Sequence, residues 1–438
     1  MKEVYVGIIG LGTVGTGVAR VLTENSDIIT KRLGARLVLK KAADLDIERD
    51  RGLNVDKTVF TTDAKEIIND PDISIVIELM GGYEPAKSFI LEAIEKSKHI
   101  VTANKALLAT YGNEIFSKAA EKDVEVAFEA SVGGGITILK SIKEGLAANR
   151  IKSIFGIING TANYILSEMT DKGESYEYCL KKAQEKGYAE ADPTFDVEGV
   201  DTAHKLAILI TLCYGTTITL DDIYTEGITK LTSLDIQFAK EFGYKIKLLA
   251  ISKEEDGKIE ARVHPTMIPE HHVLAAIDGA YNAVLLNGDA VGNVMFTGMG
   301  AGEMPTASAV VGDAIDIARN IIKGGLCRVP SLSFQDKNIT SVNLRMMDDL
   351  EAEYYLRFSV VDEPGVLSKI SGILGEHNIS IASVIQKGRS TEGAVPLVIT
   401  THHAKEKNMF HALKEIDQLS IVLDKTVSIR IEDSLGEE

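Results

Sequence analysis

Five carboxylates stand just before one lysine in residues 188–209, which read YAEADPTFDVEGVDTAHKLAIL. The acids are Glu190, Asp192, Asp196, Glu198 and Asp201, and the lysine is Lys205. The apolar run LAILITL follows Lys205 directly, so we expect residues 204–212 to form a buried helix. Asp201 and Lys205 lie four residues apart and would share one side of it. Two interpretations stay open from position alone: a structural ion-pair network, or a site that handles an amino group and a proton.

The chain begins with a β-branched run at residues 4–9, followed by GLGTVG and a helical stretch at 16–22. This order of strand, glycine turn and helix is typical of dinucleotide binding, with the phosphates at the helix N-terminus. The alternative is an ordinary glycine-rich turn. The residues we assign to the cofactor in this turn are Gly10, Leu11, Gly12, Thr13, Val14 and Gly15.

The second predicted strand, residues 36–43, indicates whether the cofactor is NAD or NADP. An NAD-binding unit usually has an acid near the end of this strand, to bind the ribose 2′-hydroxyl. Lys40 and Lys41 stand in that region here, and cations suit a 2′-phosphate, so the sequence favours NADP. Asp44 lies close enough to leave NAD open.

Further strands at 73–79, 99–103 and 124–128 alternate with helical stretches at 87–96 and 112–120. This alternation predicts a doubly wound parallel sheet.

Ligands of open α/β sheets bind beyond the carboxyl ends of the strands. Three such ends carry unusual sequences, ELMGG at 78–82, TANK at 102–105 and EASVGGG at 129–135. The last looks like backbone laid against a ligand, since three successive glycines favour neither helix nor strand. The residues that we expect to face the cofactor are Gly81, Thr102, Ala103, Asn104 and Lys105. An ordinary surface lysine is the alternative for Lys105.

The pattern changes after residue 153. A strand at 153–158 leads into Asn159-Gly160-Thr161, whose polar groups suit either substrate contact or a helix cap. A helix near 234–241 and strands at 246–251 and 259–265 predict an antiparallel α+β domain with an open sheet.

A second glycine-rich turn, GMGAGE at 298–303, precedes a helix at 307–322. We expect this helix to pack on the nucleotide-binding half and to bring Gly302 and Glu303 near the cofactor. The mixed polar stretch 324–350 is the expected linker. Beyond it, the order βαββαβ predicts a ferredoxin-like unit.

Composition limits the class of protein. The 438 residues, 45% hydrophobic and 25% charged, are typical of two or three globular domains. A net charge of -17 without basic clusters argues against nucleic-acid binding. Three distant cysteines indicate neither disulfides nor zinc. No apolar run approaches the roughly 20 residues of a membrane span, and the chain starts directly with a strand, so we expect a cytoplasmic protein. The expected domains are 1–130, 131–323 and 351–438.

Seven blocks of the sequence, taken in order, resemble homoserine dehydrogenases of the longer type with a C-terminal ACT domain. They are GLGTVG, IELMGG, VTANKALLA, FEASVGGGI, GIINGTANYIL, GYAEADPTFDVEGVDTAHKLAIL and GAGEMPTASAVVGD. The resemblance covers nearly the whole chain. It implies NAD(P)-dependent interconversion of L-homoserine and L-aspartate 4-semialdehyde, in the biosynthesis of threonine, methionine and isoleucine.

The resemblance also implies roles for single residues. Lys205 falls on the catalytic lysine and Lys105 on a second essential lysine. Glu190 falls on the residue that binds the substrate amino group, with Asp196 and Asp201 in support. The remaining residues assigned to the substrate are Tyr188, Gly160 and Thr161.

Members of this family often hold a monovalent cation, usually sodium, largely through backbone carbonyls. The matching residues are Glu129, Val132, Gly134 and Ile136. The chain departs from the family pattern at Thr137, where proline is frequent, and at Ala162, where threonine is common.

The ACT-like unit implies feedback by an amino acid, most simply threonine, or a purely oligomerising module. A homodimer or homotetramer is expected, since the module leaves sheet edges exposed. Two other functions compete with the main interpretation. They are a reductase of another amino-acid aldehyde and a non-catalytic sensor of dinucleotide and amino acid.

Overall fold

The computed structural model describes residues 1–386 and 394–436, which form two compact units. The first unit comprises Met1–Lys152, Ala203–Asp221 and Tyr281–Val342. The second comprises Ser153–Thr202, Asp222–Ala280 and Asn343–Glu438. Within the described residues, no helix is both long and apolar enough to cross a membrane.

A parallel six-stranded sheet forms the centre of the first unit. Its strands are β1 (Glu3–Ile9), β2 (Arg36–Ala43), β3 (Phe60–Thr61), β4 (Ile73–Glu78), β5 (His99–Thr102) and β6 (Val126–Ala127). They follow the order β3-β2-β1-β4-β5-β6, with every neighbouring pair parallel. This is the strand order of doubly wound dinucleotide-binding folds. The predicted α/β architecture is confirmed.

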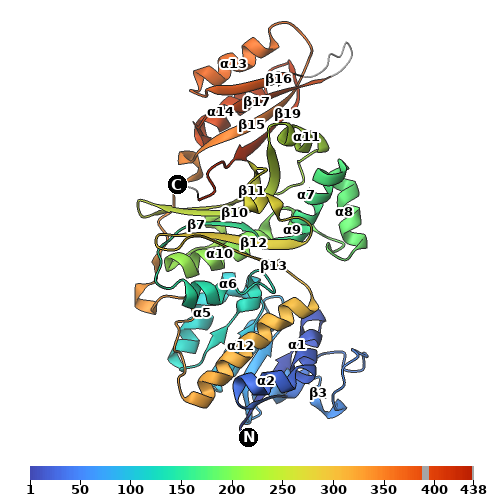
Figure 1. Cartoon of the computed structure of the whole chain (residues 1–438), viewed down its shortest axis with the longest axis vertical. Coiled ribbons are helices and arrows are strands. Elements are labelled where there is room, and N and C mark those ends of the chain that lie inside the picture. Colours follow the sequence, from blue (N-terminus) through green and yellow to red (C-terminus); the bar gives the residue numbers. More distant parts are fainter. Residues whose placement is uncertain (387–393, 437–438) are drawn as a thin grey trace. The chain divides into compact units, whose positions relative to one another are not determined.

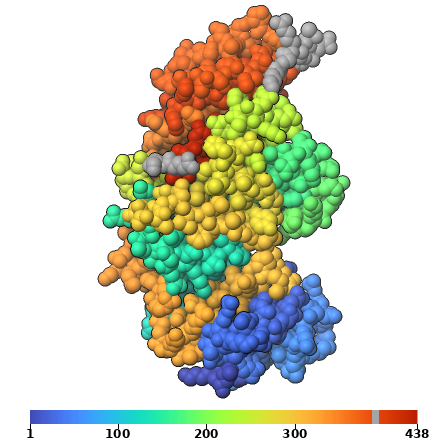
Figure 2. All heavy atoms as spheres, viewed as in Figure 1, coloured from blue at the N-terminus to red at the C-terminus, as the bar shows by residue number. Residues whose placement is uncertain are grey.

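Helices flank this sheet, and one of them returns from far along the chain. They are α1 (Thr13–Glu24), α2 (Ser26–Leu33), α3 (Ala64–Ile68), α4 (Ala86–Glu95), α5 (Lys105–Glu121) and α12 (Glu303–Lys323). Buried side chains of α12, such as Val310 and Ile317, share one core with Val18 and Leu22 of α1. Figure 2 shows the orange-yellow atoms of this late segment against the blue N-terminal residues.

The first unit also holds short elements and a hairpin. They are α6 (Ile138–Lys140), a π-helical turn (Ser141–Gly145), β8 (Thr216–Thr217), β12 (Tyr281–Gly288), β13 (Gly292–Met299) and β14 (Thr340–Ser341). Strands β12 and β13 pair antiparallel along their whole length. Helix α10 (Val200–Tyr214) starts in the second unit and ends in the first.

The stretch 324–350, expected as a linker, is attached to the end of α10. Its strand β14 pairs with β8, and the Thr216 hydroxyl donates to the Thr340 carbonyl at 3.0 Å. The Phe334 ring covers Gly215, where a Cβ would lie 2.8 Å from the ring. This segment therefore contacts the helix that carries Lys205.

The second unit begins with the predicted open α+β sheet. Its elements are β7 (Ile151–Ile157), α7 (Gly160–Lys172), α8 (Tyr176–Glu185), α9 (Thr194–Val197), β9 (Tyr224–Thr225), α11 (Ser233–Glu241), β10 (Tyr244–Glu255) and β11 (Lys258–Pro269). Strand β10 pairs antiparallel with both β7 and β11. Both β10 and β11 are longer than the sequence predicted, because they form one long hairpin around Gly257.

The C-terminal part of this unit is the predicted βαββαβ module (Figure 1). Its elements are β15 (Glu351–Val360), α13 (Val366–Glu376), β16 (Ile381–Gln386), β17 (Val395–Thr401), β18 (Ala404–Lys405), α14 (Glu406–Ile416) and β19 (Val422–Ile431). The strands follow the order β19-β15-β17-β16. Ile370 of α13 and Met409 of α14 pack with Phe358 and Leu397 of the sheet in one core.

Within the second unit, the last strand of this module extends the other sheet. Strand β19 pairs parallel with β11 through Thr266↔Arg430 and Met267↔Ile431. The Glu432 N–H then donates to the Met267 carbonyl at 3.0 Å. In Figure 2 the dark red C-terminal atoms lie beside the yellow ones of this region.

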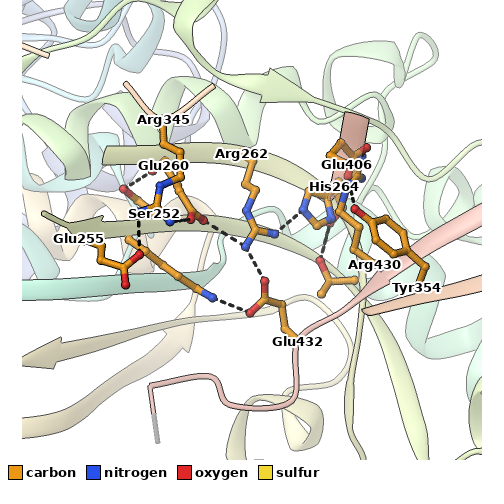
Figure 3. A network of polar contacts seen from close by, with 12 residues as sticks. Ser252, Glu255, Glu260, Arg262, His264, Arg345, Tyr354, Glu406, Arg430 and Glu432 are labelled. Atoms are coloured by element: carbon orange, nitrogen blue, oxygen red, sulfur yellow. Dashed lines mark hydrogen bonds and ion pairs between the residues drawn. The ribbon is translucent and has the colours of Figure 1, made fainter. Parts of the chain in front are cut away.

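A buried polar network surrounds this junction (Figure 3). Arg262 is only 1% exposed and donates to the Glu432 carboxylate, which also accepts from Lys253 Nζ at 2.8 Å. A second Arg262 nitrogen lies 2.8 Å from His264 Nε2. Burial raises the pKa of Glu432, but the charges of Arg262 and Lys253 outweigh it and lower the pKa to about 2.

Strand β15 of the module also contacts α11. Asp235 is fully buried, and its carboxylate accepts from Arg357 Nε at 2.6 Å and from the Tyr355 hydroxyl at 3.1 Å. The same carboxylate accepts from the N–H and the hydroxyl of Thr232, the residue that caps the N-terminus of α11. The predicted ACT-like module therefore shares buried charges with the α+β part of the second unit.

Glu432→Gln tests the junction. The substitution removes the main counter-charge of buried Arg262, so we expect the second unit to lose about 3–5 kcal/mol of stability at neutral pH. A carboxyl group with a depressed pKa stabilises the fold above its unfolded value, near 4.3, and this stability is lost as the pH falls through about 2. Urea unfolding followed by circular dichroism at pH 7, 5 and 3 measures the difference, which should shrink towards acid pH.

Glu351→Gln is the matched control, because Glu351 is exposed and its Oε1 lies 3.9 Å from Lys405 Nζ. It should cost less than about 0.5 kcal/mol. Equal stability of the two variants at pH 7 would contradict the role given to Glu432.

Candidate active site

The glycine turn before α1 has the geometry that a dinucleotide needs. Gly10 has φ +99°, and a Cβ there would lie 2.8 Å from the Leu79 backbone. A Cβ on Gly15 would lie 2.0 Å from the Gly10 carbonyl, so α1 and β1 pack closely there. A Cβ on Gly12 meets no atom within 4 Å, and no side chain caps α1 at this residue. The N–H groups at the start of α1 are thus available to a phosphate.

A pocket of about 250 Å³ lies at this turn. Its lining residues are Leu11, Gly12, Thr13, Thr16, Arg20, Arg49, Asp50, Arg51 and Glu303. Arg20 Nη1 lies 2.6 Å from Glu303 Oε1, so the start of α12 is tied to α1 beside the glycine turn. The pocket therefore combines N–H donors with arginine side chains.

The acid at the end of β2 is Asp44. Its Oδ2 accepts from the Leu11 N–H at 2.7 Å, and its Oδ1 lies 3.2 Å from Arg51 Nη2. Arg51 Nε in turn donates to the Leu11 carbonyl at 3.0 Å. Asp44 and Arg51 thus hold the glycine turn from the side of β2.

The two lysines that the sequence analysis assigned to the cofactor are engaged elsewhere. Lys40 Nζ lies 2.8 Å from both Asp70 and Asp72, which precede β4 at the edge of the sheet opposite the glycine turn. Lys41 pairs with Glu66 of α3. This geometry argues against a 2′-phosphate contact for Lys40, since its ammonium points to the amino ends of the strands. Position in the sequence could not reveal this, because the carboxylates lie about 30 residues later.

Glu78 organises the ends of β4 and β5. It is fully buried, and its carboxylate accepts from the Thr102 hydroxyl at 2.7 Å and from the Met80 N–H at 2.8 Å. Burial raises the pKa of Glu78. Gly81 and Gly82, which follow, both have positive φ and open space where a Cβ would stand.

Asn104 connects this arrangement to Lys105. Its Nδ2 donates to the Gly82 carbonyl at 2.7 Å, and its Oδ1 accepts from the Leu107 N–H at 3.2 Å. Asn104 therefore caps α5, of which Lys105 is the first residue. The predicted set Thr102, Asn104 and Lys105 does lie together at the carboxyl edge of the sheet.

The loop 129–136 is fixed by Glu129. Its carboxylate accepts from the Leu139 and Lys140 N–H groups, each at 2.8 Å. Burial and the nearby Asp313 charge raise the pKa of Glu129 to about 7. Gly134 has φ +54°, and a Cβ there would lie 2.4 Å from the Gly300 carbonyl. The loop thus lies directly on the turn that precedes α12.

In the second unit, Asn159 joins two of the predicted acids. Its Nδ2 donates to Asp196 Oδ1 at 2.7 Å and to Asp201 Oδ2 at 2.9 Å, and its Oδ1 accepts from the Ala162 N–H at 2.8 Å. The cap interpretation of this turn is therefore correct for Asn159. The sequence analysis offered substrate contact or a cap for this turn and assigned only Gly160 and Thr161 to the substrate. It did not foresee that the Asn159 amide joins two acids.

Thr161 attaches the acidic loop to α7. Its hydroxyl donates to the Tyr188 carbonyl at 2.5 Å and lies 3.3 Å from Asp196 Oδ2. The Tyr188 ring packs against Tyr164 with a centroid distance of 5.0 Å. Glu190 lies in the same loop with an exposed side chain.

The remaining acids of this stretch have local roles. Asp192 Oδ1 accepts from the Thr194 N–H at 3.1 Å and from the Thr194 hydroxyl at 2.6 Å. Glu198 Oε1 accepts from the Thr229 hydroxyl at 2.8 Å. Both residues therefore hold turns.

Lys205 lies on α10, one turn after Asp201, and is 8% exposed. The helix spans Val200–Tyr214 and so begins four residues before the predicted start. Gly199, with φ +82°, separates it from the preceding turn. The ammonium and the carboxylate are thus carried by one rigid element.

Comparisons with known proteins cover the whole chain. Family models match at residues 10–129 (homoserine dehydrogenase, NAD binding domain), 138–315 (homoserine dehydrogenase) and 354–420 (ACT domain). Homoserine dehydrogenase of Neisseria gonorrhoeae is 48% identical, and that of Bacillus subtilis 40%, each over 99% of both chains.

Comparison with solved structures points to the same family. The homoserine dehydrogenase of Thiobacillus denitrificans is similar with a TM-score of 0.93 and 47% identity, over 100% of this chain and 99% of that one. The Staphylococcus aureus enzyme is similar with a TM-score of 0.76 and 33% identity, over 99% of both chains. The resemblance seen in the sequence is confirmed. The chain belongs to the homoserine dehydrogenase family and is an oxidoreductase with a nicotinamide-cofactor-binding domain, a catalytic domain and an ACT domain.

Proposed function

We propose that Lys205 and Lys105 are the catalytic residues of this homoserine dehydrogenase, and that Glu190, Asp196 and Asp201 bind the α-ammonium group of the substrate. The observation that carries the proposal is the Asn159 amide shared by Asp196 and Asp201, one helical turn before buried Lys205. Asp201 is buried and Asp196 is partly exposed, and two carboxylates held together in this way suit a ligand that brings a positive charge.

The reaction needs a proton acceptor when L-homoserine is oxidised and a proton donor when L-aspartate 4-semialdehyde is reduced. The nicotinamide cofactor takes up or returns the hydride at the carbon atom. Lys205 in its neutral form accepts the hydroxyl proton during oxidation. In the reverse direction its ammonium stabilises the developing oxyanion and donates the proton. A buried lysine suits this task because a low dielectric strengthens its interaction with the oxyanion.

Lys105 supplies a second cation for the reacting oxygen. The supporting geometry is its place as the first residue of α5, fixed by the Glu78, Thr102 and Asn104 contacts. These contacts set the direction in which the helix leaves the carboxyl edge of the sheet.

The finer cofactor assignment is NADP, with NAD also accepted. Asp44 is engaged with Leu11 and Arg51, so it is less able to accept ribose hydroxyls than a typical acid of NAD-binding units. Arg20, Arg49 and Arg51 line the pocket at the glycine turn. We assign the 2′-phosphate contact to Arg49, which is exposed in that pocket, in place of Lys40 and Lys41.

A sodium ion at the carbonyls of Glu129, Val132, Gly134 and Ile136 is part of the same proposal. The Glu129 carboxylate binds two N–H groups and so fixes the loop, which leaves backbone oxygens as the ligands. The described residues hold no group of three or more acidic, histidine or cysteine side chains suited to a metal ion. Carbonyl ligation is consistent with a monovalent cation, which needs little negative charge.

For the ACT module we propose binding of an amino-acid effector, most simply threonine, in a homodimer or homotetramer. Support comes from the turn at Gly365, with φ +94°, which opens α13, and from β16 at the end of the strand order. An edge strand such as β16 can pair with a strand of a second copy of this chain. A purely oligomerising module is the competing proposal.

Lys205→Met tests the catalytic assignment. Loss of the proton-transfer group should reduce kcat at least about 10²- to 10⁴-fold in both directions, while the Kd of NADPH stays within about twofold. NAD(P)H absorbance measures turnover and a fluorescence titration measures binding. Lys172→Met, at an exposed lysine paired with Glu168, is the control and should keep full activity. Retention of most of kcat in the Lys205 variant would refute the assignment.

Arg49→Glu tests the cofactor assignment. Reversing the charge should raise KM for NADPH roughly 10- to 100-fold, because a charged hydrogen bond is replaced by repulsion, and leave KM for NADH nearly unchanged. Lys40→Gln is the comparison and should affect both cofactors equally, because Lys40 pairs with Asp70 and Asp72. A selective loss of NADPH in the Lys40 variant would return the 2′-phosphate to the site first expected from the sequence.

A further inference from the structure

Asn159 stands between β7 and α7 and is 5% exposed. Every polar atom of its side chain is engaged. The amide nitrogen gives one hydrogen to Asp196 at 2.7 Å and one to Asp201 at 2.9 Å, and the amide oxygen accepts from Ala162 at 2.8 Å. An asparagine amide has two N–H donors, so both are used on carboxylates.

This arrangement fixes the orientation of the amide. A flipped side chain would set its oxygen against two carboxylates and its nitrogen against the Ala162 N–H. The backbone of α7 therefore selects the orientation in which both donors face the acids. Helix capping alone needs only the oxygen atom.

The Asp196 and Asp201 carboxylates both accept from the Asn159 amide nitrogen, so their negative charges lie close together and repel each other. Each hydrogen of the amide makes a charge-assisted hydrogen bond to one carboxylate, which offsets part of this repulsion and keeps the two carboxylates side by side. Two carboxylates side by side bind an ammonium group more strongly than one.

We infer that Asn159 is a positioning residue that holds Asp196 and Asp201 together for the ammonium group of the substrate. This inference rests on the proposed function, which assigns these two acids to the substrate. It adds that the affinity for the amino acid depends on a neutral side chain that need not touch it. Thr161 assists by attaching the loop of Asp196 to the first turn of α7.

Three substitutions separate positioning from helix capping. Asn159→Asp and Asn159→Ser both keep an oxygen that caps α7, whereas Asn159→Ala removes it. Asp puts a third carboxylate in place of the two donors. Ser keeps at most one donor. If Asn159 acts only as a cap, the Ala variant is the one with altered kinetics.

The experiment measures KM and kcat for L-homoserine at saturating NADP, together with the melting temperature and the Kd of NADPH. The inference expects KM to rise most in the Asp variant, roughly 100-fold, and about tenfold in the Ser variant, as for lost hydrogen bonds to charged groups. The Kd of NADPH should not change. Ser175→Ala is the matched control, because Ser175 caps α8 through the Tyr178 N–H and contacts neither acid. Its melting temperature should fall without a change in KM.

A double variant gives a rescue. Asn159→Asp combined with Asp196→Asn restores two carboxylates and one amide to the cluster, and should lower KM at least about fivefold relative to Asn159→Asp alone. KM values within twofold of wild type in both the Asp and Ser variants would overturn the inference, whatever the Ala variant does.

Asp196→Asn and Asp201→Asn distinguish failure of the inference from failure of the proposed function. If these two variants raise KM and the Asn159 variants do not, only the positioning role is wrong. If none of them raises KM, the acids do not bind the substrate, and both ideas fall together.

Discussion

A buried or partly buried carboxylate must find hydrogen-bond donors, and this requirement fixes several loops of the candidate site. Glu78 takes the Thr102 hydroxyl and the Met80 N–H, Glu129 takes two N–H groups where α6 begins, and Asp44 takes the Leu11 N–H. Each acid stands at or just after the end of a strand of the parallel sheet. A carboxylate left without these donors would cost several kcal/mol, so the loops keep the one path that supplies them. The same constraint acts in the second unit, where one asparagine serves two acids.

The ACT module obeys this constraint as well, which has a consequence for regulation. Arg262 and Asp235 belong to the α+β part of the second unit, and their partners Glu432 and Arg357 belong to the module. Strand β19 completes the pairing of β11, and β10 links β11 to β7, the strand that leads to Asn159. An amino-acid effector of the kind proposed above that shifted β19 would act on a continuous set of paired strands that ends beside the acids. Such an effect requires different affinity for two states of these strands.

Sequence reasoning predicted the architecture because its signals are local. The GLGTVG turn, the alternation of strands and helices and the βαββαβ order are each set by neighbouring residues. It could not foresee contacts between residues that are distant in the sequence. The ion pairs of Lys40 with Asp70 and Asp72, and the hydrogen bonds of the Asn159 amide to Asp196 and Asp201, join residues about 30 to 40 positions apart. Asn159 does cap its helix, as one interpretation of the turn had it, and it also donates to both acids. An ion pair or a shared amide depends on tertiary contacts that a single sequence does not display. The roles given to Lys105, Lys205 and the cation loop follow from the family resemblance and stay predictions.

The segment 324–350 shows how a stretch with no strong sequence pattern gains fixed contacts with its neighbours. Phe334 covers Gly215 and β14 pairs with β8, so the segment is bound to the C-terminal end of the helix that carries Lys205. At its other end, Arg345 pairs with Glu255 and Glu260 of the β10–β11 hairpin. The segment therefore has fixed contacts near both of its ends. The lysine's helix is therefore attached at its N-terminal turn to the Asn159 cluster, through Asp201, and at its C-terminal end to the segment that leads into the ACT module. Hydrogen bonds and strand pairing thus hold both ends of this helix, which fixes the direction of its axis at Lys205.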